Sequence, residues 1–338
     1  MGHKVAINGA GRIGRAVLRI IMDTPELELV AVNDLMQADD LSYLLRYDTV
    51  YGREFERVVS ESSHIYFGKK SFRLLHEKDP DHLPWGDLGI EIIFECTGLF
   101  LKKEELEKHI KSGAQRVLLS APPKGDGVTI IVPGVNILPS EEKICSIASC
   151  TTNCLAPVAE IMARRVGVKK AAMTTVHAYT TSQALVDKAE QKHRRGRAAA
   201  GNIVPTSTGA AVATTRVVTS LKDKFDGVAI RVPVAIGSIA DATFVTTRTT
   251  TIEEVNKIFI EESESERYRG ILAVTKDEIV SSDIIRDSHA STVDLTMTRV
   301  IDGDLVKVMS WYDNEWGYAS QMVREAVHIA SDLSSHSA

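Results

Sequence analysis

The chain has 338 residues, of which 44% are hydrophobic and 25% charged, and its formal net charge is −5. This length exceeds what one compact core needs, so we expect two domains. The negative charge argues against nucleic acid as a primary partner, and no apolar run is long enough for a membrane span. The N-terminal stretch shows no signal pattern, so we expect a cytoplasmic protein.

In the first half of the chain, short apolar runs alternate with helical patterns. Lys4–Asn8 predicts a strand, which leads through a glycine turn into a helix predicted over Arg12–Met22, and Leu27–Asn33 predicts a second strand. Further β-branched runs lie at residues 90–95, 116–120 and 129–132. Strands that alternate with helices favour right-handed βαβ units. We therefore expect an α/β fold whose first domain, residues 1–149, contains a Rossmann-type parallel sheet.

After about residue 150 the apolar runs become longer and richer in β-branched residues. They lie at residues 171–179, 227–235, 242–251, 291–300 and 305–312. Asp302-Gly303-Asp304 is a hairpin signal between the last two runs. We expect an α+β catalytic domain with a mostly antiparallel sheet over residues 150–315. Residues 252–262 predict a helix, and a C-terminal helix, 316–338, is expected to pack back on the first domain.

The glycine turn matches the pattern G-x-G-x-x-G at Gly9, Gly11 and Gly14. It follows a predicted strand and opens a predicted helix, which is the context that gives the pattern meaning. Gly9 permits the tight turn, Gly11 lets the backbone approach a pyrophosphate, and Gly14 lets the helix pack closely on the sheet. Asp34 follows the next strand and is placed to accept hydrogen bonds from an adenosine ribose, which favours NAD over NADP. The alternative, a glycine turn that serves packing alone, does not explain why Asp34 follows the next strand.

The stretch ASCTTNCLAP holds Cys150 and Cys154, two of only four cysteines. A disulfide within one helical turn is awkward, and no nearby His or Cys cluster suggests zinc. Cys154 falls on the apolar face of the predicted helix and is expected to pack as a small hydrophobic residue. Cys150 stands at the helix N-terminus, where the dipole and the free amides stabilise a thiolate. On this stretch alone, a buried structural cysteine and a reactive thiol are equally open for Cys150.

His177 ends a strand-like run and supplies the candidate base. A thiolate adds to an aldehyde to give a hemithioacetal, which loses hydride to a nicotinamide and leaves a thioester. The histidine takes the hydroxyl proton as the hydride leaves. A thiol, a histidine and a dinucleotide site together therefore favour an aldehyde dehydrogenase, although a lone strand-end histidine is more often structural.

Two elements are candidates for binding anions. Residues 205–211 (PTSTGAA) form a hydroxyl-rich turn that leads into a helix. Arg231 stands in an apolar strand, where an arginine usually has an anionic partner. The basic segment 193–197 (HRRGR) is equally well explained as a solvated loop or a subunit contact.

Taken together, seven stretches resemble the phosphorylating glyceraldehyde-3-phosphate dehydrogenase family. They are NGAGRIGR, ASCTTNCLAP, VHAYT, RRGRAAAGNIVPTSTGAA, IRVPV, VSSDIIRDSHAS and WYDNEWGY. The resemblance runs from residue 4 to about residue 330, and ASCTTNC and WYDNEWGY are highly specific.

The resemblance implies a role for each matching residue. Cys150 is implied as the acyl-forming nucleophile and His177 as its acid/base partner. The residues implied to contact the cofactor are Gly9, Gly11, Arg12, Ile13, Gly14, Asp34, Ser120 and Asn314. Those implied for inorganic phosphate are Ser149, Thr151, Thr208 and Gly209, and those for the substrate's own phosphate are Thr180, Arg195 and Arg231. The resemblance also implies glyceraldehyde 3-phosphate and inorganic phosphate as substrates, a homotetramer, and no metal.

The chain departs from the family pattern at two places. Thr181-Ser182 precede Gln183 where the family usually has Asn-Asp or Ala-Thr, and Lys188-Ala189 stand where NAD-specific members commonly carry Leu-Pro. Lys188 is a candidate for binding a 2′-phosphate, so we expect NAD as the main cofactor with NADP as a secondary one. Two alternative functions are an erythrose-4-phosphate dehydrogenase, which hydrolyses the thioester, and a scaffold that binds NAD without catalysis.

Overall fold

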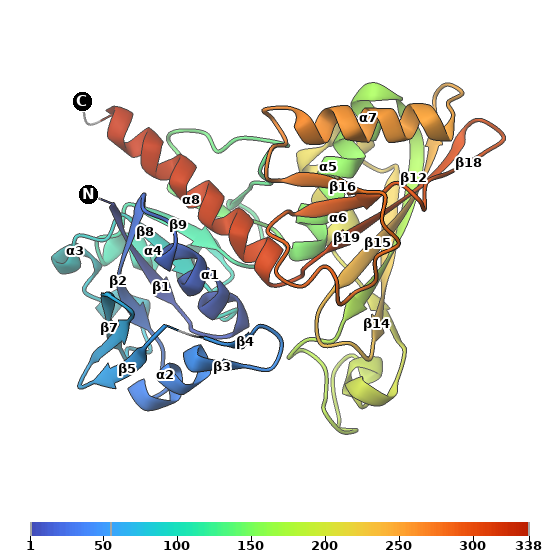
Figure 1. Cartoon of the computed structure of the whole chain (residues 1–338). Helices are drawn as coiled ribbons and strands as arrows, with labels where there is room; N and C mark the ends of the chain where they lie inside the picture. The colour runs from blue at the N-terminus through green and yellow to red at the C-terminus, as the bar shows by residue number, and fades with distance from the viewer. Residues whose placement is uncertain (1, 55, 337–338) are drawn as a thin grey trace. The chain divides into compact units, whose positions relative to one another are not determined.

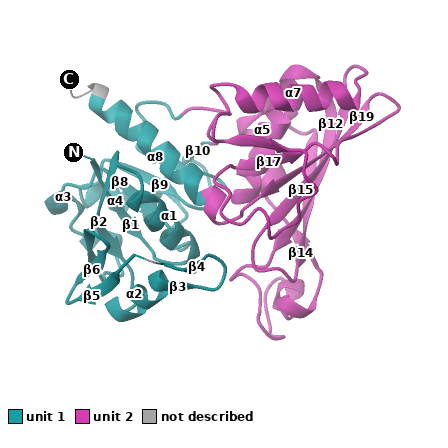
Figure 2. Ribbon diagram, viewed as in Figure 1, with its two compact units in different colours: residues 1–131, 138–148, 319–338 teal, residues 132–137, 149–318 magenta. Residues whose placement is uncertain are grey.

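The computed structural model describes residues 2–54 and 56–336, and in it the chain divides into two compact units. Unit 1 consists of residues 1–131, 138–148 and 319–338, and unit 2 of residues 132–137 and 149–318 (Figure 2). Residues 337 and 338, the end of the predicted C-terminal helix, lie outside the described residues.

Unit 1 is built on a nine-stranded sheet with the order β10-β11-β9-β8-β1-β2-β7-β6-β5 (Figure 1). The pairs from β10 to β7 are parallel, and the pairs β7–β6 and β6–β5 are antiparallel. The strands are β1 (His3–Asn8), β2 (Leu27–Asn33), β5 (Val58–Glu61), β6 (His64–Phe67), β7 (Lys70–Leu75), β8 (Ile92–Glu95), β9 (Arg116–Leu119), β10 (Thr129–Ile130) and β11 (Ile144–Ser146). The predicted Rossmann-type parallel sheet is confirmed, and the antiparallel strands β5 and β6 extend it.

Among the described residues of unit 1, four α-helices lie wholly in this unit: α1 (Arg12–Met22), α2 (Ala38–Arg46), α3 (Trp85–Leu88) and α4 (Lys103–Lys111). A small hairpin of β3 (Tyr47–Asp48) and β4 (Gly52–Arg53) follows α2. The helix α8 (Trp316–His336) belongs to unit 1 from residue 319 onward, and Ser334 Oγ lies 3.0 Å from His3 Nε2.

The order of the strands creates a switch point in unit 1. From β1 the chain proceeds through β2 and β7 toward one edge, and through β8, β9 and β11 toward the other. The loops that follow β1 and β8 therefore leave the same carboxyl edge in opposite directions, which is where ligands bind in open α/β sheets. The glycine turn follows β1, and residues 96–99 follow β8.

Unit 2 is built on an eight-stranded sheet with the order β13-β14-β12-β15-β19-β17-β16, and β18 pairs with β19. The pairs β12–β14 and β16–β17 are parallel and the others antiparallel, which confirms the predicted mostly antiparallel sheet. The strands are β12 (Val168–Ala178), β13 (Val204–Ser207), β14 (Phe225–Val232), β15 (Ser238–Thr246), β16 (Leu272–Thr275), β17 (Ser291–Asp294), β18 (Arg299–Ile301) and β19 (Leu305–Tyr312).

The predicted strand at residues 291–300 is wrong as a single element. β17 ends at Asp294, whose side chain accepts hydrogen bonds from the backbone N–H and the hydroxyl of Thr296. Such a turn competes with continuation of the strand. The predicted hairpin lies between β18 and β19, where Asp302 (φ 49°) and Gly303 (φ 75°) adopt the left-handed conformations that a tight hairpin requires.

Three helices pack against the sheet of unit 2: α5 (Cys150–Arg165), α6 (Ala210–Val217) and α7 (Ile252–Glu264). The apolar face of α5 contributes Leu155, Val158, Ile161 and Met162 to the main core. An ion-pair cluster also joins α5 to α7, because buried Glu262 binds Arg164 at 2.8 Å and Arg165 at 2.6 Å. These contacts fix the middle and the C-terminal end of α5, the helix that begins at Cys150.

Candidate functional site

The glycine turn of unit 1 has three glycines in three different environments. Gly9 adopts φ +95°, and a Cβ there would lie 2.7 Å from the backbone N of Thr97. A Cβ on Gly14 would lie 1.9 Å from the carbonyl oxygen of Gly9, so only glycine lets α1 approach the turn so closely. A Cβ on Gly11 would meet nothing within 4 Å. Gly9 and Gly14 are thus required by packing, whereas Gly11 faces open space at the N-terminus of α1.

Asp34, directly after β2, contacts the glycine turn. Its Oδ2 accepts a hydrogen bond of 2.6 Å from Ala10 N, and its Oδ1 accepts one of 3.0 Å from Met36 N. Ser120 follows β9 directly and is half-buried, and its N–H donates to Glu95 O. The carboxylate of Asp34 is therefore hydrogen-bonded to the glycine turn, with which it was expected to form a cofactor site.

Arg12 and Ile13 open α1 and are half-buried. The guanidinium of Arg12 binds Asp48 at 2.5 Å and lies 5.4 Å from the ring centroid of Tyr51. The side chain of Arg12 therefore binds within unit 1. The residue also stands in the first turn of α1, where backbone N–H groups do not bond to carbonyls of the same helix. Asp48 had no motif around it and was missed by sequence reasoning.

Cys150 is the first residue of α5, in unit 2. Ser149 is the N-cap, and its Oγ accepts a hydrogen bond of 3.1 Å from Thr152 N. Cys154 is fully buried and contacts Ser291 Oγ at 3.6 Å. All four cysteines are free, and the described part of the chain has no group of three or more His, Cys, Asp or Glu side chains placed to hold a metal.

The sulfur of Cys150 lies 3.5 Å from Nε2 of His177, near the end of β12. His177 Nδ1 lies 2.7 Å from Ala178 O. The carbonyl oxygen only accepts and favours a proton on Nδ1, whereas the guanidinium of Arg231, which contacts the same nitrogen, only donates and favours a proton on Nε2; the two contacts therefore do not assign one tautomer of the neutral imidazole. Arg231 lies against the same nitrogen and donates to the same carbonyl at 2.8 Å. The thiol and the imidazole are thus brought together from positions 27 residues apart.

Burial dominates the charge states of this pair. Burial raises the pKa of the Cys150 thiol, although the positive charge of Arg231 and hydrogen bonds with Thr151 partly lower it. Burial and then Arg231 lower the pKa of His177 to about 3. Burial of the sulfur thus opposes the ionisation that the helix N-terminus was expected to favour. The pair rests as a thiol beside a neutral imidazole.

Tyr312, the last residue of β19, packs against the pair formed by Cys150 and His177. Its Oη lies 2.9 Å from Thr151 Oγ1 and 2.8 Å from Thr175 Oγ1, and its ring meets that of His177 edge-on with centroids 5.8 Å apart. The side chain is fully buried. In the sequence, Tyr312 is marked only by its place in the stretch WYDNEWGY.

The structure places the expected phosphate-site residues on several elements of unit 2. Arg195, in the short 3₁₀ helix His193–Gly196, donates from Nε to Thr206 Oγ1 at 3.0 Å, and its charge acts on both His177 and Arg231. Arg231 lies one residue before the end of β14, nearer that end than the sequence suggested. Thr180 follows β12 and contacts Ser182 Oγ at 2.8 Å. These residues give the surroundings of the pair two positive charges.

Thr208 and Gly209 stand at the start of α6. The hydroxyl of Thr208 accepts from Ala210 N at 3.2 Å, and a Cβ on Gly209 would meet nothing within 4 Å. Thr151, by contrast, is buried with its hydroxyl on Tyr312. Asn314, the remaining expected cofactor residue, also lies in unit 2 and accepts from Ser238 Oγ at 3.0 Å.

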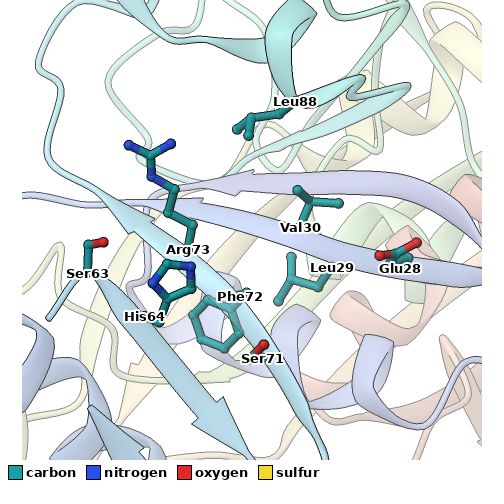
Figure 3. Close-up of a pocket in the computed structure, with 9 residues that line it drawn as sticks. All are labelled: Glu28, Leu29, Val30, Ser63, His64, Ser71, Phe72, Arg73 and Leu88. Carbon is teal, nitrogen blue, oxygen red and sulfur yellow. The ribbon is translucent and has the colours of Figure 1, made fainter. Parts of the chain in front are cut away.

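A surface hollow of about 560 Å³ lies elsewhere in unit 1 (Figure 3). Side chains of β2, β6 and β7 line it, together with Leu88 of α3, and none of the expected site residues is among them.

Of the helices in the described part of the chain, none combines the length and apolar character that crossing a bilayer demands.

Comparison with known proteins assigns both halves of the chain. Residues 3–103 match the family model described as "Glyceraldehyde 3-phosphate dehydrogenase, NAD binding domain", and residues 149–314 match "Glyceraldehyde 3-phosphate dehydrogenase, C-terminal domain". The chain is 45% identical to a glyceraldehyde-3-phosphate dehydrogenase of Streptomyces coelicolor over 98% of this chain and 100% of the relative. It is 44% identical to one of Geobacillus stearothermophilus (98% and 99%) and 46% to one of Clostridium pasteurianum (97% and 98%). The chain therefore belongs to the glyceraldehyde-3-phosphate dehydrogenase family.

Proposed function

We propose that the chain catalyses the NAD-dependent, phosphorylating oxidation of glyceraldehyde 3-phosphate to 1,3-bisphosphoglycerate. The observation that carries the proposal is the contact of 3.5 Å between Cys150 Sγ and His177 Nε2 at the tip of α5. Membership of the family and its matched NAD-binding domain support the same activity. In this proposal residues 1–149 form the cofactor-binding domain and residues 150–315 the catalytic domain.

The residues of unit 1 fit a dinucleotide. The open space at Gly11, the N-terminus of α1 and the carboxylate of Asp34 beside the turn supply room, a positive dipole end for a pyrophosphate and an acceptor for a ribose. When bound, NAD supplies the acceptor for the hydride that the substrate loses. Ser120 and Asn314 complete the proposed set of cofactor contacts.

Cys150 is the proposed nucleophile. As its sulfur bonds to the aldehyde carbon, the thiol proton passes to Nε2 of His177, the ring nitrogen 3.5 Å from the sulfur, in the tautomer that carries its proton on Nδ1. The backbone N–H groups at the start of α5 are proposed to stabilise the oxygen of the resulting hemithioacetal. Nε2 first returns the thiol proton to the oxygen, which becomes the hemithioacetal hydroxyl. The now unprotonated Nε2 withdraws the hydroxyl proton as the carbon loses hydride, and a thioester remains on Cys150.

Inorganic phosphate completes the reaction by attacking the thioester carbon, which releases the acyl phosphate and restores the sulfur. We propose that Arg195, Arg231 and Thr180 bind the phosphate that the substrate already carries. Ser149, Thr151, Thr208 and Gly209 are proposed to hold the attacking phosphate. The two arginines are the positive charges available to such anions near the pair.

A single set of assays tests this function. Wild type, Cys150→Ser and the control Cys154→Ser, which changes the buried neighbour, are assayed for reduction of NAD with glyceraldehyde 3-phosphate, with and without phosphate. We expect activity in wild type and in the control, none in Cys150→Ser, and nearly intact NAD binding in all three. Full activity in Cys150→Ser would overturn the assigned nucleophile.

The same assays separate the alternatives. Formation of an acyl phosphate only when phosphate is added supports the phosphorylating reaction. A product released by water, with erythrose 4-phosphate as the better substrate, would favour the erythrose-4-phosphate dehydrogenase. NAD binding without turnover would favour the scaffold.

NAD is the proposed main cofactor. Lys188, the candidate for a 2′-phosphate, pairs with Glu190 at 2.8 Å, so a phosphate must compete with a carboxylate for it. A catalytic efficiency that is higher with NADP than with NAD would refute this choice and the role given to Asp34.

We also propose a homotetramer in the cytoplasm. Leu185, Val186 and Ile203 expose 82%, 70% and 70% of their surfaces, and exposed large apolar side chains in one region favour a protein interface. Sedimentation velocity at micromolar concentration tests the assembly, and a single species of 37.0 kDa would refute it.

A further inference from the structure

At the carboxyl edge of the unit 1 sheet, Glu95 lies in a fully buried polar cluster that the mechanism above does not use. Glu95 ends β8, and its side chain is 0% exposed. Its Oε2 accepts from Asn8 Nδ2 at 2.6 Å and contacts His109 Nε2 at 3.1 Å. Its Oε1 accepts from Thr97 N at 2.8 Å and from the Thr97 hydroxyl. Four donors therefore converge on one carboxyl group.

The partners of this cluster determine where the protons lie. The indole N–H of Trp85, which can only donate, lies 3.0 Å from His109 Nδ1, so Nδ1 accepts. The proton of His109 is then on Nε2, which donates to Glu95. The hydroxyl of Thr97 accepts from Leu99 N at 3.1 Å, so its own proton is free for Glu95. Every partner donates, which leaves no position for a donor on residue 95.

Glu95 connects the two loops that leave the switch point. Asn8 is the last residue of β1, and Gly9 follows it; Thr97 belongs to the loop after β8. The two loops also touch, since a Cβ on Gly9 would lie 2.7 Å from Thr97 N. Asn8 O accepts from Cys96 N at 2.7 Å, and Asn8 Oδ1 accepts from Asn33 Nδ2 at 2.7 Å. A shift of Thr97 is therefore transmitted to the glycine turn through direct contact.

We infer that Glu95 is a positioning residue: its carboxylate joins the turn at Gly9 to the loop at Thr97 and holds both in the arrangement that receives the dinucleotide. This inference rests on the proposed NAD-dependent function. Glu95 is buried beneath the backbone it orders and contacts no ligand itself. Its effect is on cofactor affinity, because the loops must otherwise be ordered at the moment of binding.

The substitution Glu95→Gln tests the role with almost no change in shape. Whichever way the new amide turns, its NH₂ faces two donors, either Asn8 and His109 or the N–H and hydroxyl of Thr97. We expect the dissociation constant for NAD to rise about tenfold or more, while kcat at saturating NAD stays within about twofold. Amide hydrogen exchange is expected to become faster in residues 8–14 and 96–99, both with and without NAD.

Glu91→Gln is the matched control. Glu91 lies just before β8, at the opposite end of the strand, is part-exposed and binds His3 Nδ1 at 2.7 Å. The same chemical change there is expected to leave NAD affinity within about twofold of wild type. Equal loss of affinity in both variants would show a nonspecific effect on the unit and overturn the inference.

Other results of the same measurements also support or overturn the positioning role of Glu95. NAD affinity of Glu95→Gln within about twofold of wild type overturns the positioning role. If Glu95→Gln does not fold, Thr97→Val replaces it: a loss of affinity of about threefold or more supports the role, and none overturns it. If wild type binds no NAD, the proposed function fails instead. The exchange rates at the two loops in Glu95→Gln then decide whether Glu95 orders them.

Discussion

Removing the hydroxyl of Tyr312 tests the idea that a buried hydrogen-bond network supports the thiol and imidazole from below. Tyr312→Phe keeps the ring that meets His177 edge-on and deletes only the oxygen shared by Thr151 and Thr175. Both threonines are almost fully buried, with 4% and 1% exposed. Each loses a partner that water cannot easily replace.

The expected magnitude follows from these two contacts. A buried hydrogen bond contributes about 1 kcal/mol net, so losing two costs about 2 kcal/mol in all. About 1 kcal/mol of this concerns the packing of α5 on the sheet, because Thr151 lies on α5 whereas Thr175 lies on β12 within the sheet. Thr175→Val removes one of them and is expected to cost about 1 kcal/mol. The double variant is expected to cost about the same as Tyr312→Phe alone, because the bond between the two side chains can be lost only once.

Alkylation of Cys154 measures this change in the folded protein. Cys154 is fully buried in contact with Tyr312, so it reacts only when α5 opens away from the sheet. Cys150 reacts first, and the second label on the peptide reports Cys154. A loss of about 1 kcal/mol in the packing of α5 corresponds to roughly fivefold faster labelling. Tyr66→Phe, at an exposed position of β6, is the control for losing a tyrosine hydroxyl. A Tyr312→Phe rate within twofold of wild type would refute the reasoning.

Three further predictions concern charge. Arg231→Gln is expected to slow the alkylation of Cys150 by iodoacetamide, because the Arg231 charge lowers the pKa of that thiol; an unchanged rate contradicts this. Asp34→Ala is expected to raise the ratio of catalytic efficiencies, NADP over NAD, about tenfold, since the carboxylate that repels a 2′-phosphate is gone; kinetics with both cofactors measure it. Glu262→Gln is expected to lower the free energy of unfolding by about 1–2 kcal/mol at neutral pH. This figure is less than the full cost of breaking a buried ion pair, because Arg164 and Arg165 are partly exposed. Burial opposes ionisation of Glu262, but both arginines lower its pKa, so its contribution is present above pH 4.5 and lost as the pH falls through the folded pKa; urea midpoints at pH 7 and pH 3 check this.

Local patterns were sufficient for the elements whose signal lies within a few residues. The helix predicted at Arg12–Met22 and the strand predicted at Leu27–Asn33 have those bounds in the structure. The period of apolar residues and the glycines that precede a helix are properties of neighbours in the chain. The run at residues 291–300 was misread because a single turn, made by the side chain of Asp294, outweighs the β-branched composition on either side.

The sequence by itself determined the chemical parts: a glycine turn with its acid, a thiol at the start of a helix, a histidine at a strand end, and arginines for anions. Only the tertiary structure decided which of these parts touch and in what state they rest. The contact of Cys150 with His177, the bridge from Tyr312 to Thr151 and the enclosure of Glu95 join residues 27, 161 and up to 87 positions apart. The ionisation of the thiol also depended on tertiary structure, because desolvation is set by everything packed around a group, whereas a helix dipole is set by the segment that forms the helix.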